Sequence, residues 1–470
     1  MFSASVVRRR RAVRRLAAVA VASGLMAAGS IAGAGAAVAD DAIQHQGGAV
    51  ATLDGLQTYH QAVLHTNGKD QEILAGLFEM TVDGGGQLQT YCIDIHNPTQ
   101  EQAKYLETPW AQTSLNDNAN AGKIRWILQN SFPQVNDLAA LAKSAELDGT
   151  LTDRTAAAGT QVAIWRFSDK ADVTASDPAA EQLADWLEKS AENLAEPKAS
   201  LSLEPSAVSG KPGSRLGPVT VRTDAGEVAV TPPADAVASG IKITDEAGKP
   251  VTTATDGAKL YFDVPEDAAD GTAALSVQAG MSVPVGRAFA SATKSQTQIL
   301  AGSSESTVSA TATATWAKQG AIPAVSVEKN CAKGGVDVTA SNKGDAPFTF
   351  SLAGFEHTIG AGESRTVTVP VAEDQAYDFT ITGPGGFEKN FKGVLDCKTS
   401  SAPQEPGTET PSSEPSPASA GGTSGGMQGD LAETGGSGAT PMIAGIAIAM
   451  MLAGGGAVFF LRKKKTTTGA

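Results

Sequence analysis

The chain contains little cysteine, histidine or aromatic side chain. Its 470 residues include three cysteines and five histidines, and aromatic residues make up 5%. No histidine stands at metal-ligand spacing from a cysteine or an acidic residue. No phosphate-loop pattern occurs. The sequence therefore predicts no bound metal and no cofactor.

Basic residues are scarce outside the two ends of the chain. Ten of the 36 lie in terminal segments that contain no acidic residue, which leaves 26 basic against 50 acidic residues between them, a formal net charge of −24. Binding to nucleic acid requires a basic face. We therefore expect no nucleic-acid partner, and the excess negative charge favours a soluble, self-repelling protein.

Residues 1–39 have the pattern of a signal peptide. Six arginines before position 16 precede an uncharged run rich in Ala and Gly, which ends in Ala37-Val38-Ala39. A basic head, an apolar middle and a small-x-small box predict cleavage after Ala39. A short membrane anchor is the alternative. The pair Arg14-Arg15 leaves Sec and twin-arginine export both open.

The C-terminal residues 431–470 have three parts in a fixed order. Leu431-Ala432-Glu433-Thr434-Gly435 comes first, residues 442–461 form an uncharged apolar run, and Arg462-Lys463-Lys464-Lys465 follows. About 20 apolar residues can cross a hydrocarbon core as a helix, and the basic cluster would hold the tail on the cytoplasmic side. The pattern predicts a transmembrane segment at 442–461.

This arrangement resembles a sortase sorting signal of the Leu-Ala-x-Thr-Gly type. The resemblance implies that a sortase cleaves after Thr434 and joins Thr434 to peptidoglycan. The protein would then be secreted, held briefly in the membrane by its C-terminal helix, and anchored covalently to the cell wall. A plain single-span membrane protein is the alternative. The Ala/Gly-rich composition and the motif variant also resemble actinobacterial proteins.

Between the ends, composition divides the chain into four zones. Residues 45–197 hold four of the five tryptophans, residues 200–320 and 325–398 have short β-like runs, and residues 399–430 are rich in Pro, Ser and Gly. Alternating segments such as 348–352 and 365–369 predict sandwich strands. The last zone cannot bury a core and is expected to be a disordered, wall-spanning linker.

Two of the three cysteines lie near the ends of the zone 325–398. Export would allow Cys331 and Cys397 to form a disulfide, which we predict. Sandwich domains of wall proteins sometimes contain Lys–Asn isopeptide bonds, but no particular triad can be chosen from this sequence.

The third cysteine lies in a segment that alternates as a half-buried strand does, Gln87 to Ile95. A helix is expected at 153–167, with Asp153 as a fair N-cap. Helical spacing places Ala157, Ala158, Gln161 and Trp165 on one apolar face. A buried glutamine needs partners, so Gln161 is a candidate functional residue.

These two segments carry a second resemblance. Thr160-Gln161-Val162-Ala163-Ile164-Trp165 fits the Thr-Gln-x-Ala-Ile-Trp motif of the thioester domains of Gram-positive surface adhesins, and Tyr91-Cys92-Ile93-Asp94 resembles their cysteine segment. The resemblance implies a mixed α/β thioester domain over residues 45–197 and an internal thioester between Cys92 and Gln161. An amine of a partner, a protein lysine or a polyamine, would open that bond once, without enzymatic turnover.

Two other functions remain open from the sequence. A lone buried cysteine is often an inert small hydrophobe, and the protein would then be a non-covalent surface adhesin or coat protein. A secreted cysteine hydrolase would require a base such as His96, four residues from Cys92. The expected architecture is multidomain: the thioester domain, two all-β immunoglobulin-like sandwich domains, the linker and the transmembrane helix.

Overall fold

The computed structural model describes residues 47–66, 68–234 and 236–399. The predicted signal peptide with Ala39, the linker beyond residue 399, the motif Leu431 to Gly435 and the apolar run 442–461 lie outside these residues. Among the residues described, no helix is both long and apolar enough to cross a membrane.

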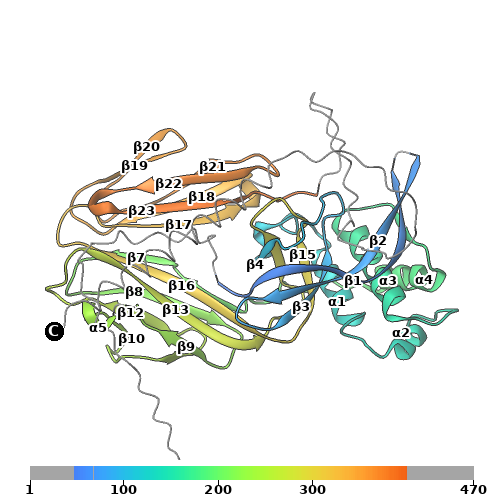
Figure 1. Cartoon of the computed structure of the whole chain (residues 1–470). Coiled ribbons are helices and arrows are strands. Elements are labelled where there is room, and N and C mark those ends of the chain that lie inside the picture. The colour runs from blue at the N-terminus through green and yellow to red at the C-terminus, as the bar shows by residue number, and fades with distance from the viewer. Residues whose placement is uncertain (1–46, 67, 235, 400–470) are drawn as a thin grey trace, which may run out of the picture. The chain divides into compact units, whose positions relative to one another are not determined.

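The first domain is built on a sheet that closes on itself (Figure 1). β1 pairs with β4 at its start and with β2 along most of its length, so the sheet returns to its first strand. Within the described residues its order is β2 (Lys69–Val82), β3 (Gln87–Cys92), β15 (Gln298–Ser303), β14 (Ala288–Ser291), β4 (Lys104–Thr108), β1 (Val50–Thr66) and β5 (Val173–Ala175).

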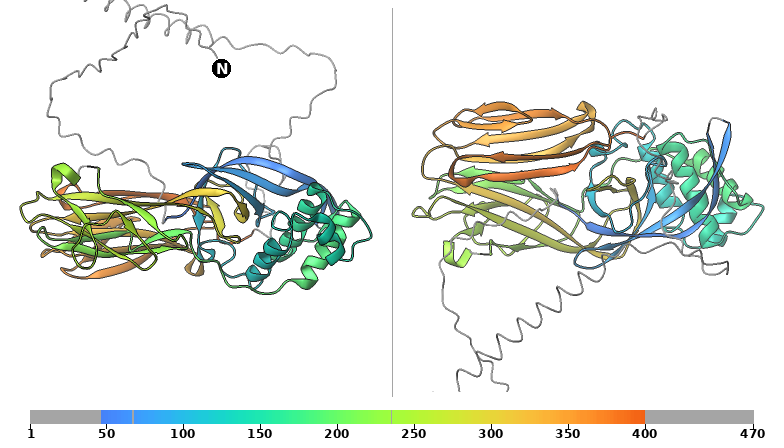
Figure 2. Two further views of the ribbon diagram at one scale, coloured as in Figure 1. Left: turned by 90° about the horizontal axis from the view of Figure 1, so that it is seen from below. Right: turned by 45° about the horizontal axis from the view of Figure 1, so that its top comes forward.

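The domain also contains a group of helices beside the β1–β2 hairpin; Figure 2 shows them in teal and green against the blue strands. They are η1 (Trp110–Gln112), α1 (Ala121–Asn130), α2 (Leu138–Ser144), α3 (Asp153–Ser168) and α4 (Pro178–Ser190). The helix expected at 153–167 is therefore confirmed as α3. Its N-cap is Thr152 rather than Asp153, because Thr152 and Thr155 form a capping box.

The helix α3 is buried on nearly all sides, which is more than the single apolar face expected from its sequence. Thirteen of its 16 residues are buried. It packs against β1, β2 and β3 on one side and against α1 and α4 on the other. Small residues make this position possible because they let neighbouring backbones approach closely.

The second domain contains two sheets. One has the order β10 (Lys242–Thr244), β12 (Lys259–Asp263), β8 (Arg215–Thr223) and β6 (Leu201–Glu204). The other is β11 (Thr253–Ala254), β9 (Val228–Thr231), β13 (Gly271–Ser282), β16 (Glu305–Trp316) and β7 (Ala207–Gly210). A short helix, α5 (Ala236–Ser239), follows β9. Alternate residues of both sheets are buried, such as Val219, Val221, Leu275 and Val277.

The predicted boundary between the first two domains needs a correction. Residues 288–303 belong to the range 200–320 that was expected to form one sandwich, but β14 and β15 pair with β4 and β3 of the first domain. The chain leaves the second domain after β13, adds these two strands to the first sheet, and returns as β16. Composition could not reveal this, because both sheets use similar β-forming residues.

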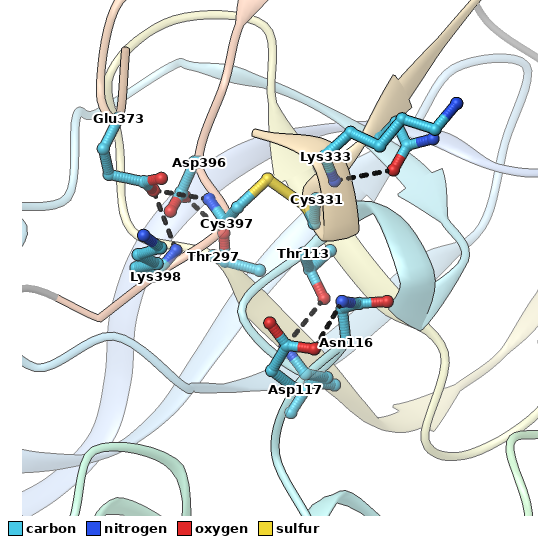
Figure 3. Close-up of a disulfide and its surroundings, with 12 residues drawn as sticks. Thr113, Asn116, Asp117, Thr297, Cys331, Lys333, Glu373, Asp396, Cys397 and Lys398 are labelled. Atoms are coloured by element: carbon cyan, nitrogen blue, oxygen red, sulfur yellow. Dashed lines mark hydrogen bonds between the residues drawn. A yellow bond between two sulfur atoms is a disulfide. The ribbon is translucent and has the colours of Figure 1, made fainter. Parts of the chain in front are cut away.

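The third domain follows at residue 323. Its strands are β17 (Pro323–Asn330), β18 (Gly335–Asn342) and β21 (Ser364–Pro370) in one sheet, with the pairs β19 (Phe348–Leu352)–β20 (Phe355–Ile359) and β22 (Ala376–Thr382)–β23 (Glu388–Val394). Two 3-10 turns, η2 (Cys331–Lys333) and η3 (Pro384–Gly386), complete it. The predicted disulfide is present: Cys331 and Cys397 are bonded, with Cα atoms 5.3 Å apart (Figure 3).

Candidate functional site

The free cysteine, Cys92, is the last residue of β3, and β3 lies between β2 and β15 in the closed sheet. Cys92 is fully buried, and its register partner on β15 is Gln298. The strand ends here because the chain turns at Asp94 to Asn97, as its bends and turns show. The Cys92 side chain therefore lies where the hydrogen-bonded strand pairing of β3 ends, and it is surrounded by buried residues.

The structure brings Gln161, which the resemblance paired with Cys92, onto the backbone of Cys92. The Cys92 N–H donates to Gln161 Oε1 at 3.0 Å, and Gln161 Nε2 donates to the Cys92 carbonyl oxygen at 2.8 Å. Both residues are completely buried. This two-point contact holds the carboxamide beside the cysteine, and it already supplies an N–H donor to the oxygen that would become an oxyanion.

Three neighbouring groups determine the chemistry of the sulfur. The Asp94 N–H donates to Cys92 Sγ at 3.2 Å, and the thiol can donate to the Asp94 carbonyl oxygen at 3.2 Å. Burial raises the pKa of the Cys92 thiol well above its usual range, and the charges of Asp169 and Asp94 add to this effect. The thiol is therefore protonated at neutral pH, and nucleophilic attack requires a proton acceptor.

The indole of Trp165 has the opposite effect on the pKa of the Cys92 thiol. It lies near enough to the sulfur to lower the pKa of the Cys92 thiol, although its Nε1–H has no hydrogen-bond partner of ordinary geometry in the part of the chain that the structure describes. A buried donor next to the sulfur can stabilise a thiolate when that thiolate leaves. Trp165 is 2% exposed and also helps to exclude water from the site.

One buried carboxyl group, that of Asp169, can accept the proton, whereas that of Asp94 is held protonated. Burial raises the pKa of Asp94 well above its usual range, and the charges of Asp396 and Asp169 raise it further. Burial raises the pKa of Asp169 to about 7, while hydrogen bonds from Ser168 and the Ile95 N–H oppose that shift. A carboxyl group with a pKa near neutrality can both take up and release a proton at physiological pH.

Polar residues of β15 and the turn before it were missed by the sequence reasoning. Ser295, Gln296, Thr297 and Gln298 are all buried beside the cysteine strand. The Thr90 hydroxyl donates to Gln298 Oε1 at 3.1 Å, and the Ile93 N–H donates to the Thr297 carbonyl oxygen at 3.0 Å. The only signal in the sequence was an unusual polar run, Ser-Gln-Thr-Gln, next to an apolar one.

The motif residue Thr160 and the neighbour Tyr91 have structural roles around the site. Thr160 Oγ1 lies 2.7 Å from Ser131 Oγ and donates to the Ala156 carbonyl oxygen. The Tyr91 hydroxyl donates to the Phe132 carbonyl oxygen at 2.8 Å. These bonds fix α3 and β3 to the segment after α1, so that Gln161 and Cys92 are held from two sides.

His96 does not pair with the cysteine. It lies in the turn after β3 and is exposed, and no hydrogen bond joins it to Cys92 among the residues described. The geometry expected of a cysteine–histidine nucleophile is therefore not found at this position.

Comparisons with known proteins agree with the geometry. Residues 89–193 match the family model described as "Thioester domain", and residues 323–394 match "Bacterial phospholipase C, C-terminal domain". No curated protein matches the chain.

Solved structures similar to this chain include three whose names refer to TIE proteins. The Bacillus anthracis TIE protein is 15% identical, with 75% of this chain and 81% of that one covered and a TM-score of 0.26. The thioester domain of the Enterococcus faecium TIE86 protein is 15% identical, covering 57% and 97%, with a TM-score of 0.26. That of the Staphylococcus aureus TIE protein is 14% identical, covering 57% and 99%, with a TM-score of 0.22.

These TM-scores are too low to assign a fold. The similarity to thioester domains therefore rests on the family-model match. The matched residues 89–193 include both Cys92 and Gln161. The part of this chain that holds Cys92 against Gln161 is therefore similar to the thioester domain family.

Proposed function

We propose that this is a secreted surface protein that forms an internal thioester between Cys92 and Gln161 and uses it to attach covalently to an amine-bearing partner. The partner would be a protein lysine or a polyamine. The observation that carries the proposal is the two-point hydrogen bonding of the Gln161 side chain to the Cys92 backbone, within a region that matches the thioester domain family.

The bond would form by intramolecular acyl transfer. The Cys92 sulfur attacks the side-chain carbonyl carbon of Gln161, and the thiol proton passes to a carboxylate, for which Asp169 is available. The carbon–nitrogen bond then breaks, and ammonia leaves with that proton. Fixed alignment of this kind can contribute about 7–11 kcal/mol toward the barrier.

The thioester would then react with the partner. The amine nitrogen attacks the same carbonyl carbon, the carbon–sulfur bond breaks, and the Cys92 sulfur takes up the proton that the amine loses. The product is an amide that links position 161 to the partner, with the Cys92 thiol restored. Each molecule reacts once, so the protein is not a turnover enzyme.

The location follows from the terminal segments. Cleavage after Ala39 would produce the exported chain, and a sortase acting at Leu431-Ala432-Glu433-Thr434-Gly435 would join Thr434 to peptidoglycan. Residues 442–461 would retain the precursor in the membrane until then. The second and third domains would act as immunoglobulin-like stalk modules that carry the thioester domain away from the wall.

Mass spectrometry of the mature chain, residues 40–434, tests the proposal. The intact chain is expected to be lighter than its sequence mass by one ammonia, and treatment with methylamine should add one methylamine at Gln161. Cys92→Ala and Gln161→Ala should both abolish the mass loss and the label. Gln182→Ala, which changes a glutamine on α4 that pairs with Asp148 at the surface, should leave both intact.

A free, alkylatable Cys92 together with an unchanged Gln161 in the peptide map would contradict the thioester. The protein would then be the non-covalent adhesin with an inert cysteine, an alternative that the complete burial of Cys92 supports. A glutamate found at position 161 would instead show that a thioester had formed and been hydrolysed.

A further inference from the structure

A group of carboxylates from the third domain lies beside the turn that follows the cysteine strand. Glu373 and Asp374 precede β22, and Asp396 precedes the disulfide cysteine Cys397. Each of the three offers a carboxylate oxygen, and these oxygens lie within 4.8 Å of one another. Figure 3 shows Glu373 and Asp396 next to the disulfide. We call Glu373, Asp374 and Asp396 the acidic cluster.

The first domain contributes a fourth carboxylate to this place. Asp94 is 1% exposed, and Asn97 Nδ2 donates both to Asp94 Oδ2 at 2.6 Å and to Asp374 Oδ1 at 3.4 Å. Asn97 therefore bridges the buried Asp94 to the acidic cluster. After burial, the charge of Asp396 is the largest influence that keeps Asp94 protonated, which places these two carboxyl groups close together.

Two oxygens of this group have no partner. Asp94 Oδ1 and Asp396 Oδ1 are both buried and make no hydrogen bond with any described residue. The other oxygen of Asp396 accepts from the Thr297 hydroxyl at 2.6 Å, and Glu373 Oε1 accepts from the Cys397 and Lys398 N–H groups. The carboxylates of Asp396 and Glu373 are thus held in place by hydrogen bonds, while Oδ1 of Asp396 accepts none from the described residues. Buried polar atoms of this kind require a partner.

The protein supplies little positive charge in contact with the group. Lys294 lies 3.7 Å from Asp374 and is half exposed. Lys329 is near enough to influence Asp396 and Glu373, but it forms no ion pair within 4 Å with either in the part of the chain that the structure describes. Three carboxyl groups therefore lie together, and a fourth, Asp94, is joined to them through Asn97, with one weak contact to a cation.

We propose that the acidic cluster, with Asp94 behind it, binds a divalent cation of the Ca²⁺ type that joins the third domain to the segment carrying Cys92. The sequence predicted no metal, because that expectation considered histidine and cysteine spacing rather than carboxylates far apart in the chain. The proposal does not depend on whether the thioester forms.

The ligand chemistry and the spacing favour Ca²⁺. Ca²⁺ binds carboxylate oxygens at about 2.3–2.6 Å, and three carboxylate oxygens within 4.8 Å of one another are close enough to be bound by one ion. Its coordination geometry is flexible and tolerates oxygens that already accept hydrogen bonds, such as those of Asp396 and Glu373. Mg²⁺ requires a stricter octahedron and usually keeps several waters, so a site built mainly of protein carboxylates favours Ca²⁺.

Titration calorimetry and thermal unfolding of the mature chain, residues 40–434, test the proposal after treatment with a chelator. CaCl₂ should bind with a Kd of about 10⁻⁴–10⁻³ M, the range of extracellular sites, and should raise Tm. Asp396→Asn and Glu373→Gln should weaken binding about tenfold or more, since ligand charge sets the affinity. In chelator, both variants should melt above the unmodified chain, because the repulsion is relieved. Glu356→Gln, an exposed acid of β20 in the same domain, is the matched control and should bind Ca²⁺ unchanged.

Three results would each overturn the inference. The first is the absence of both binding heat and a Tm change at ~10 mM Ca²⁺, well above the expected Kd. The second is an unaltered Ca²⁺ response in Asp396→Asn, and the third is a response to spermidine without a response to Ca²⁺. The same titration in Cys92→Ala should match that of the unmodified chain, so loss of the thioester and loss of the cation site are read separately.

Discussion

At the scale of single residues, the contacts that stabilise Gln161 in the fold are the same ones on which the proposed reaction depends. A buried primary amide must hydrogen bond through its oxygen and its nitrogen, and Gln161 uses the backbone of Cys92 for both. The same two bonds keep the carboxamide beside the sulfur. No additional residue is needed to bring the two reacting groups together.

The buried carboxyl group of Asp169 predicts a change of stability with pH. Its folded-state pKa of about 7 lies above the ordinary value of 3.8, so the folded chain binds this proton more tightly than the unfolded chain. The resulting stability is complete below about pH 4 and is lost as pH rises through about 7. Its slope is at most about 1.4 kcal/mol per pH unit.

Asp169→Asn should remove this dependence. In urea unfolding between about pH 4 and pH 8, the stability of the variant relative to the unmodified chain should rise with pH and become constant above about pH 7. Asp267→Asn, at an exposed position, should follow the unmodified chain at every pH. Parallel profiles for the unmodified chain and Asp169→Asn would show that Asp169 is ionised throughout.

The sequence pointed to Cys92 and Gln161 as a pair but not to the carboxyl groups around them. Cys92 and Gln161 belong to short continuous motifs that resemble a family, so their meeting could be inferred. Asp169 has no motif of its own, and its burial arises from the packing of α3 against the turn after β3. Asp374 and Asp396 reach the site from almost 300 residues away, as the Asn97–Asp374 bond illustrates.

At the scale of elements, the packing of α3 depends on a glycine. Gly159 faces the backbone of α4, and a Cβ at this position would lie 2.5 Å from the Ala180 carbonyl oxygen. The start of α4 is fixed by its N-cap, since Asp177 accepts from the Ala179 and Ala180 N–H groups at 3.0 Å. The two helices therefore have no room to separate without disturbing their caps.

Gly159→Ala should destabilise the protein, although alanine favours helix by about 1 kcal/mol in an open position. Overpacking against backbone should cost about 1–3 kcal/mol in urea unfolding, and methylamine labelling of Gln161 should fall because Gln161 lies two residues away on the same helix. Gly226→Ala, where no atom lies within 4 Å of the added Cβ, should change stability by less than about 0.5 kcal/mol. A stabilised Gly159→Ala would show that α4 moves freely.

Local sequence patterns predicted where helices and strands lie better than they predicted which other segments these elements contact. The strand at Cys92 and the helix at 153–167 were both found, since alternation and helix propensity are properties of nearby residues. The N-cap moved by one residue to Thr152 because a capping box was overlooked. The pairing of β15 with β3 could not be predicted, because strand pairing between distant segments leaves no periodic signal.

At the scale of the whole molecule, one buried ion network connects the first domain to the chain that enters the second. Arg287 Nε contacts Glu107 Oε1 at 2.8 Å, and its guanidinium also contacts Glu196 Oε1 at 2.8 Å. Glu107 in turn accepts from Ser200 and from the Ala49 N–H. Arg287 lies just before β14, so the network fixes the segment that returns to the first sheet.

Arg287→Ala should leave Glu107 as an unpaired buried charge. Loss of one partner of a buried pair costs about 3–5 kcal/mol, and thermal unfolding should show a correspondingly lower Tm. Arg222→Ala removes an exposed arginine that lies 3.4 Å from Glu204, and it should cost less than about 1 kcal/mol. Equal effects for the two variants would contradict a structural role for the buried network.

The pairing of β14 and β15 with the first sheet also means that this sheet is complete only after residue 303 has been synthesised. Thr90 and its hydrogen-bond partner Gln298 are 208 residues apart, and synthesis adds about 5–20 residues per second. The strand that carries Cys92 therefore waits on the order of tens of seconds for its neighbour. During that delay Cys92 and Gln161 already exist, but the wall that excludes water from them does not. A reactive bond made before β15 pairs with β3 would be exposed to hydrolysis, so the proposed thioester depends on a segment far away in the sequence for its protection from water.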